Sequence, residues 1–204
     1  FNYEPGRKAF ISIKKANVRE WLKTFLPNTR LILEPKIRGY SIAIQYIYGK
    51  LNKAIDENSL DITEKIISLR NIPKSIPIKN RIEIQGVLYH EEIKTDSNTE
   101  CKLNNNKNKS TNHNQINFCA FHIFHCKLSQ FNTLQELKKL NLEIPENHFT
   151  IYTSDIEIYR ECWRKGKLFQ KYPSCGIVAK INSRKLQKQL GESKVTRNWA
   201  YTIY

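Results

Sequence analysis

The sequence contains no methionine, little glycine and proline, and few acidic residues. Its 204 residues include 7 Gly, 7 Pro and 19 Asp+Glu against 34 Lys+Arg. Because methionine is absent, we expect the chain to be an internal part of a longer protein. No apolar run approaches the roughly 18 residues that span a bilayer, so no membrane insertion is expected. The first residues also lack the charged-then-apolar pattern of a signal peptide.

Cysteine is sparse and irregularly spaced. The chain has five in all: Cys101, Cys119, Cys126, Cys162 and Cys175. An odd set without Cys-x-x-Cys spacing argues against a disulfide framework, and it predicts an intracellular, reducing compartment.

A zinc site can be imagined from four neighbouring side chains of zinc-ligand type: Cys119, His122, His125 and Cys126. On a strand, alternation divides these side chains between two faces, so they cannot surround one ion. We therefore predict no metal site here.

The charge balance points to a polyanionic partner. The formal net charge is +15, with 40% hydrophobic and 26% charged residues, as expected for one globular domain. A surplus of this size favours nucleic acid, with DNA ahead of RNA. The alternative is a basic subunit of a larger nucleoprotein or protein assembly. Net charge alone does not distinguish such a subunit from a nucleic-acid-binding protein.

The pattern of apolar residues predicts one α+β domain over residues 1–204. Short strands alternate with helices without a regular βαβ repeat, which favours mixed, mainly antiparallel sheets flanked by helices. Capping boxes predict one helix from Asp61 and another from Thr133. Residues 94–117 are rich in Asn and Lys and have no apolar period, so a flexible polar insertion is expected there.

The stretch 31–45 places one lysine between two apolar runs. Lys36 follows a strand-like segment and precedes Gly39 and a second apolar segment. Burying an ammonium costs free energy, and a lysine so placed is often a nucleophile. A surface lysine at a hairpin turn is the alternative, because a lone Lys-x-x-Gly string is common.

Motifs along the chain resemble those of NAD-dependent DNA ligases. Glu34, Lys36 and Gly39 match the Glu-x-Lys-x-Asp-Gly signature of that family, in which the lysine becomes adenylylated. Further similar segments follow in the same order: 10–13, 61–66 with Ile72-Pro73, 176–183, Leu186-Gln187, Leu190-Gly191 and Trp199-Ala200. The resemblance covers nearly the whole chain. It implies the α+β adenylation-domain (nucleotidyltransferase) fold, two twisted, mainly antiparallel sheets flanked by helices, with a nucleotide between the sheets.

The resemblance also implies roles for individual residues. Lys36 matches the nucleophile, Glu34 the acceptor for the adenine amino group, and Lys180 a phosphate-contacting lysine. Phe121 matches the ring that stacks on adenine. The other implied cofactor-binding positions are Ser12, Ile13 and Gly39. NAD or AMP, with Mg²⁺, is the cofactor expected if activity is retained.

Several positions depart from the family pattern. Arg38 replaces the aspartate of the signature, and Val87 stands where the family has a metal-linked glutamate. Cys175 replaces another aspartate, and Tyr204 stands where a lysine is expected. Each lost electrostatic stabiliser typically costs about 10²–10³ in rate. We therefore predict an inactive, degenerate member without a bound cofactor, retained for nucleic-acid binding or scaffolding. An active NAD-dependent ligase subunit completed by another chain remains the alternative.

Overall fold

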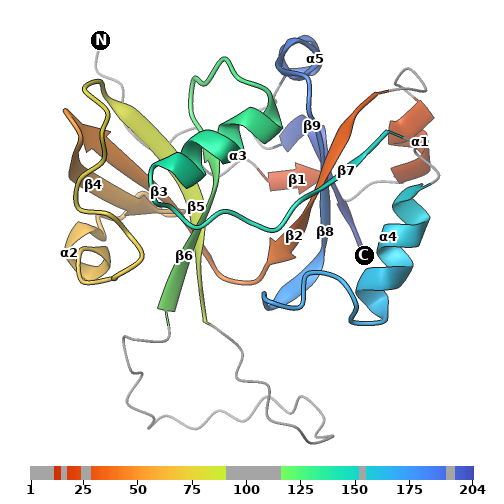
Figure 1. The fold of residues 1–204 in the computed structure, drawn as a ribbon, viewed down its shortest axis with the longest axis horizontal. Helices are drawn as coiled ribbons and strands as arrows, with labels where there is room; N and C mark the ends of the chain where they lie inside the picture. The colour runs from red at the N-terminus through yellow and green to blue at the C-terminus, as the bar shows by residue number, and fades with distance from the viewer. Residues whose placement is uncertain (1–11, 15–17, 24–28, 91–115, 152–154, 192–195) are drawn as a thin grey trace, which may run out of the picture.

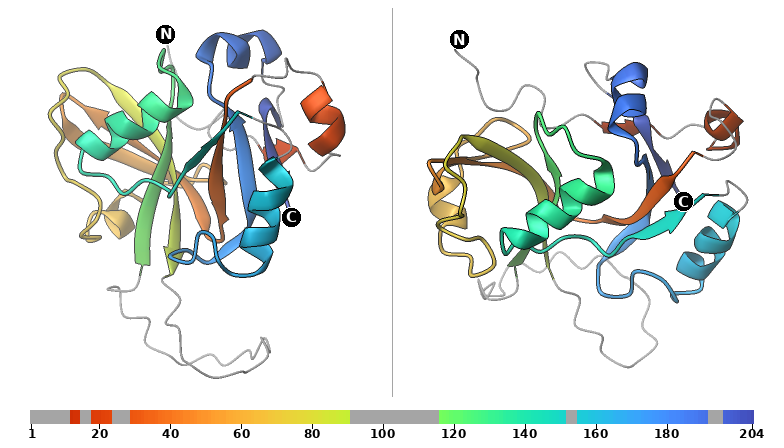
Figure 2. Two further views of the ribbon diagram at one scale, coloured as in Figure 1. Left: turned by 45° about the vertical axis from the view of Figure 1, so that its right-hand side comes forward. Right: turned by 45° about the horizontal axis from the view of Figure 1, so that its top comes forward.

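The structure is a computed structural model that describes residues 12–14, 18–23, 29–90, 116–151, 155–191 and 196–204. Its strands form two sheets that lie side by side and are linked by the short connection between β2 and β3 (Figures 1 and 2). The first sheet has the order β1 (Ser12–Lys14), β9 (Thr196–Ile203), β8 (Ser174–Ile181), β2 (Leu31–Ile37), β7 (His148–Thr150). The second has the order β4 (Lys50–Asp56), β3 (Tyr40–Ile47), β5 (Ile82–His90), β6 (Ile116–Ile123).

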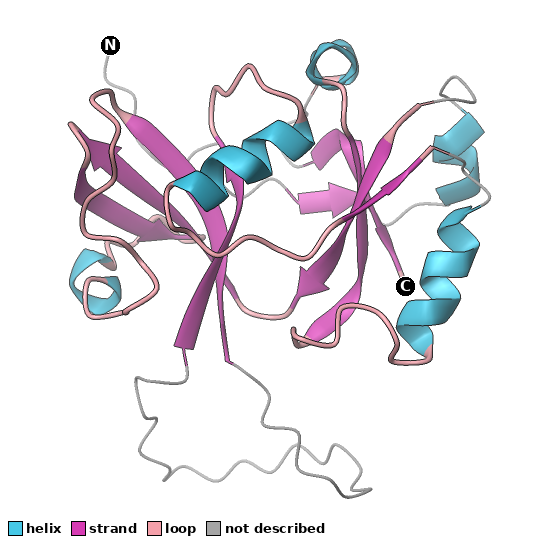
Figure 3. Cartoon of the chain, in the orientation of Figure 1, coloured by secondary structure: helices cyan, strands magenta, loops and turns pink. Residues whose placement is uncertain are grey.

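The described strand pairs are antiparallel except for β1 with β9, which is parallel. Helices lie around the sheets, as Figure 3 shows: α1 (Val18–Lys23), α2 (Thr63–Ile66), α3 (Gln130–Lys139), α4 (Asp155–Arg164) and α5 (Arg184–Leu190). The predicted α+β architecture with two mainly antiparallel sheets is therefore confirmed. No helix among the described segments is long and apolar enough to cross a membrane.

Strand β2 contributes to both hydrophobic cores because successive side chains on a strand point to opposite faces. Leu31 and Leu33 pack with Ile156 of α4 in the core of the first sheet. Ile32 packs instead with Leu134 of α3 in the core of the second sheet. The alternation places Glu34 and Lys36 on the same face of β2 as Ile32, toward the second sheet.

Two predicted helix starts are wrong. Helix α3 begins at Gln130 with Ser129 as N-cap, whose side chain accepts a hydrogen bond from the Asn132 N–H. Thr133 lies inside the helix and donates its hydroxyl to the Ser129 carbonyl. A serine four residues upstream therefore provides the cap. The helix predicted from Asp61 is the short α2, and Asp61 forms a local turn by accepting the Thr63 N–H.

The predicted polar insertion lies almost entirely outside the described residues, which omit 91–115. Its C-terminal boundary needs a correction, because Ile116 and Asn117 already belong to β6. They pair there with His90 and Tyr89 of β5. The strand extends this far because the register continues to satisfy backbone hydrogen bonds and because Ile116 packs against the second core.

Candidate functional site

A buried ion pair on the first sheet forms the centre of the candidate site. Lys180 Nζ lies 2.6 Å from Glu34 Oε2, and the two side chains are only 4% and 3% exposed. Lys180 on β8 is the register partner of Ile32, two residues from Glu34 on β2. Burial lowers the pKa of Lys180, against the opposing attraction of Glu34. The structure therefore brings together two residues that the sequence placed 146 positions apart.

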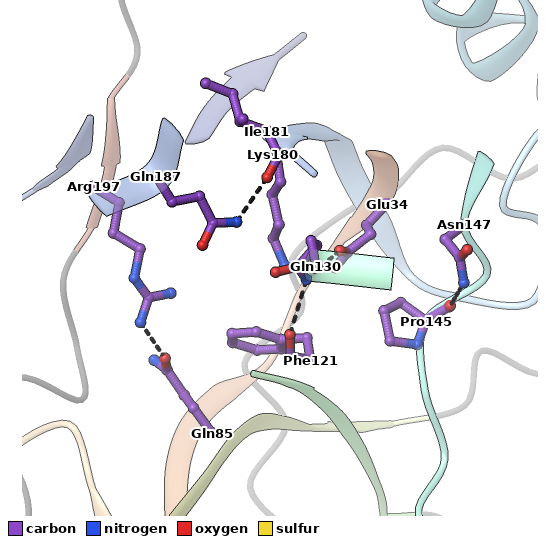
Figure 4. A network of polar contacts seen from close by, with 10 residues as sticks. All are labelled: Glu34, Gln85, Phe121, Gln130, Pro145, Asn147, Lys180, Ile181, Gln187 and Arg197. Atoms are coloured by element: carbon purple, nitrogen blue, oxygen red, sulfur yellow. Dashed lines mark hydrogen bonds and ion pairs between the residues drawn. The ribbon is translucent and has the colours of Figure 1, made fainter. Parts of the chain in front are cut away.

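Gln130, at the start of α3, completes this pair from the side of the second sheet. Its Nε2 donates to Glu34 Oε1 at 2.9 Å and to the Phe121 carbonyl at 3.3 Å (Figure 4). Both carboxylate oxygens of Glu34 are thus engaged. The centroid of the Phe121 ring lies 4.9 Å from Lys180 Nζ. Sequence analysis missed Gln130, because no local pattern distinguishes it from a surface glutamine near a helix start.

Lys36 lies apart from this buried pair, near the end of β2. It is half-buried, and its Nζ donates to the Tyr204 hydroxyl at 2.6 Å. The same ammonium lies 4.9 Å from the centroid of the Tyr204 ring. The residue that replaces an expected lysine is therefore the direct neighbour of the predicted nucleophile.

Where the family resemblance would place a metal-linked carboxylate, the chain has the apolar Val87 of β5. Val87 is 6% exposed and belongs to a small core with Tyr89, Cys119 and Tyr172, against which Ile37 packs. No group of three or more potential metal ligands exists among the residues that the structure describes.

The two remaining substitutions near Lys36 do not supply a carboxylate either. Arg38 is exposed, and its backbone N–H donates to the Pro173 carbonyl at 2.8 Å. The Cys175 thiol donates to the Lys36 carbonyl at 3.5 Å.

A second buried cation, Arg197 on β9, lies near the pair and was missed by the sequence reasoning. Arg197 is 3% exposed, and its Nη2 donates to Gln85 Oε1 of β5 at 2.8 Å (Figure 4). Its guanidinium carbon also lies 5.3 Å from the centroid of the Trp199 ring. No local pattern indicates this contact, because Gln85 and Arg197 lie 112 positions apart in the sequence.

His122 lies within this cationic surrounding as a buried neutral ring. Its ring centroid lies 6.0 Å from that of Trp199. Burial, together with the charges of Arg197, Lys180 and Arg184, holds the pKa of His122 well below its usual range. The imidazole is therefore a neutral member of the site at pH 7. Of the other residues considered as zinc ligands, Cys119 belongs to the Val87 core, and Cys126 lies 3.6 Å from the Thr133 hydroxyl.

The remaining predicted site residues lie on β1 and between β2 and β3. Ser12 and Ile13 belong to β1, and their backbones pair with Thr196 and Arg197 of β9. Gly39 connects β2 to β3 in close contact with β5: a Cβ added there would lie 2.0 Å from the Leu88 carbonyl oxygen. Packing alone thus accounts for a glycine at this position.

Comparisons with known proteins find similarity in sequence and in fold. No family model matches the chain. The DNA ligase of Mesoplasma florum is 26% identical over 199 residues, covering 85% of this chain and 30% of that protein.

Solved structures share the fold. The ligase domain of Mycobacterium tuberculosis LigD has a TM-score of 0.57 at 15% identity, covering 89% of this chain and 55% of that one. The ATP-dependent DNA ligase of bacteriophage T7, in complex with ATP, has a TM-score of 0.55 at 11% identity, covering 97% of this chain and 68% of that one. Sequence and fold together support a relationship to the DNA ligase adenylation domains. The chain spans less than a third of the length of its sequence relative.

Proposed function

We propose that this chain is a degenerate DNA-ligase-type adenylation domain that no longer transfers AMP and is retained to bind nucleic acid. The observation that carries the proposal is Val87, a buried apolar residue where the family resemblance calls for a metal-linked carboxylate. Phosphoryl transfer needs cations and a held divalent metal to neutralise the charge that develops. A buried valine at that position provides neither.

The surroundings of Lys36 support the same proposal. Its ammonium donates to a tyrosine hydroxyl, where the family would place a second cation. A neutral phenol cannot replace the charge of a lysine in stabilising a phosphoryl group. Glu34 and Lys180, by contrast, match the family and form an internal pair, which supports retention of the fold.

An adenylation assay tests the loss of chemistry. The protein is incubated with Mg²⁺ and labelled NAD or, separately, labelled ATP, and covalent label is measured after denaturation. The NAD arm follows the family resemblance, and the ATP arm follows the cofactor named for the T7 enzyme. We expect no adduct in either arm. An adduct that is lost in Lys36→Ala would instead show the alternative function, an active ligase subunit.

The net charge of +15 carries the nucleic-acid part of the proposal. We test binding by gel shift with nicked duplex DNA, intact duplex DNA and RNA over a series of salt concentrations. The logarithm of the binding constant should fall linearly with the logarithm of the salt concentration. We expect DNA to bind more tightly than RNA. If no probe binds even at low salt, the nucleic-acid proposal is wrong, and the alternative of a basic scaffold subunit in a protein assembly is favoured.

Two groups of exposed basic residues offer matched variants. The segment after α2 presents three charges to solvent: Arg70, Lys74 and Lys79. The residues of a second group form ion pairs with Glu161 or Glu143: Arg164, Lys165 and Lys171. We propose the first group as the phosphate-contacting surface. Changing it to glutamine should lower the salt slope by about 0.9 per lost phosphate contact, and changing the second group should lower it less.

A further inference from the structure

We propose that the Gln130 side chain occupies the place of a nucleobase amino group, so that the chain itself closes its base-binding site. The inference rests on the proposed ancestry of the site but does not require nucleic-acid binding. It concerns the Glu34–Lys180 pair and two residues that contact it, Gln130 and Phe121.

The contacts of Gln130 reproduce those that an aminated base would make. A primary amide nitrogen has two N–H groups, and Gln130 Nε2 directs them to Glu34 Oε1 at 2.9 Å and the Phe121 carbonyl at 3.3 Å. Adenine and cytosine each present an amino group beside a ring nitrogen that accepts. Lys180 supplies the matching donor beside Glu34. The Phe121 ring supplies the kind of aromatic surface on which bases stack.

Gln130 is held in this position by its backbone as well as its side chain. Its N–H donates to the Asn182 carbonyl at 3.0 Å, and the next residue, Phe131, donates its N–H to Asn182 Oδ1 at 3.0 Å. The Ser129 N-cap fixes the same helix start. Gln130 is 2% exposed. A base therefore reaches Glu34 only by displacing an amide that already satisfies both acceptors.

This arrangement predicts a gain of function on truncation. Removing the carboxamide frees Glu34 Oε1 and the Phe121 carbonyl for the amino group of a ligand. The ligand then no longer has to replace two existing hydrogen bonds, one of them to a charged group. We expect Gln130→Ala to bind AMP about tenfold or more tightly than the unmodified protein.

The experiment measures binding of AMP and IMP by titration calorimetry to the unmodified chain, Gln130→Ala and Gln130→Asn. IMP carries a carbonyl in place of the amino group, so it cannot donate to Glu34. The gain should appear for AMP and stay within about twofold for IMP. Gln130→Asn keeps a polar side chain but is shorter by one methylene, and it should show a smaller gain of the same kind.

Gln187→Ala is the matched control. Gln187 is a second buried glutamine whose Nε2 donates to a backbone carbonyl, that of Ile181 at 2.7 Å, on the side of the pair remote from Gln130 in Figure 4. Its truncation should leave AMP affinity unchanged. The proposal is overturned if neither Gln130 variant gains AMP affinity, if AMP and IMP gain equally, or if Gln187→Ala gains as much. The adenylation assay and the gel shifts report on the proposed function separately, so failure of one is distinguishable from failure of the other.

Discussion

Lys36 and Tyr204 lie 168 positions apart in the sequence, and their side chains meet in a 2.6 Å hydrogen bond. Two residues along β2, Glu34 forms a contact of the same length with Lys180. The first contact is open to solvent and the second is buried. Because water screens the Lys36–Tyr204 contact and not the Glu34–Lys180 pair, their contributions to the free energy of unfolding should differ greatly.

Removing Lys180 should strongly destabilise the protein. Lys180→Met leaves the Glu34 carboxylate buried without its cation, which typically costs about 3–5 kcal/mol in free energy of unfolding. Urea denaturation measures the change. The double variant Glu34→Leu/Lys180→Met should regain most of the loss, since no unpaired charge remains. Lys23→Met, which removes an exposed partner of Glu20, should cost less than about 1 kcal/mol. A double variant as unstable as the single one would contradict the ion-pair assignment.

The contact between Lys36 and Tyr204 should contribute little to stability. Lys36→Met and Tyr204→Phe should each lower the free energy of unfolding by about 1 kcal/mol or less, because the hydrogen bond and the ring contact are largely exposed. A double-mutant cycle in urea measures their coupling. A coupling energy as large as that of the buried pair would show that Lys36 is far less solvated than the structure indicates.

Acid should destabilise the fold through His122. The pKa of this histidine is lowered in the folded state, so the unfolded chain binds a proton first as the pH falls below about 6.5. Stability contributed by the neutral ring is complete above that pH and is lost below it, by up to about 1.4 kcal/mol per pH unit. Unfolding curves between pH 7 and 5 should show a smaller loss for His122→Phe. His90→Gln changes an exposed histidine and should leave the loss intact; equal curves for both variants would refute the assignment.

Gly39→Ala should destabilise the chain without any ligand present. The added Cβ would lie 2.0 Å from the Leu88 carbonyl oxygen, so β3 and β5 would have to move apart. Overpacking of this kind typically costs about 1–3 kcal/mol. Gly166→Ala is the comparison, since its Cβ would meet nothing within 4 Å and only its positive φ would add strain. If Gly39→Ala is neutral in thermal unfolding, the close approach is not part of the native fold.

Some turns and helix ends are determined by residues adjacent in the sequence. At the turn between β3 and β4, Gly49 has a φ of 77°, which glycine adopts at little cost. Helix α5 likewise has local end signals, with Ser183 as its N-cap and Gly191 as its C-cap. The start of α3 was misplaced because Ser129 and Thr133 offer equivalent capping side chains. Their tertiary neighbours decide between them, through the bond from the Gln130 N–H to the Asn182 carbonyl.

The sequence by itself determined the α+β class, the two mainly antiparallel sheets and the likeness to DNA ligases, because apolar periodicity and short motifs are written along the chain. It also identified Glu34, Lys36, Phe121 and Lys180 as candidates. Only the tertiary structure decided that Glu34 and Lys180 form a closed pair with Gln130, and that Arg197 reaches Gln85. Those contacts join strands and helices far apart in sequence, so their geometry depends on how the two sheets pack and not on any local pattern.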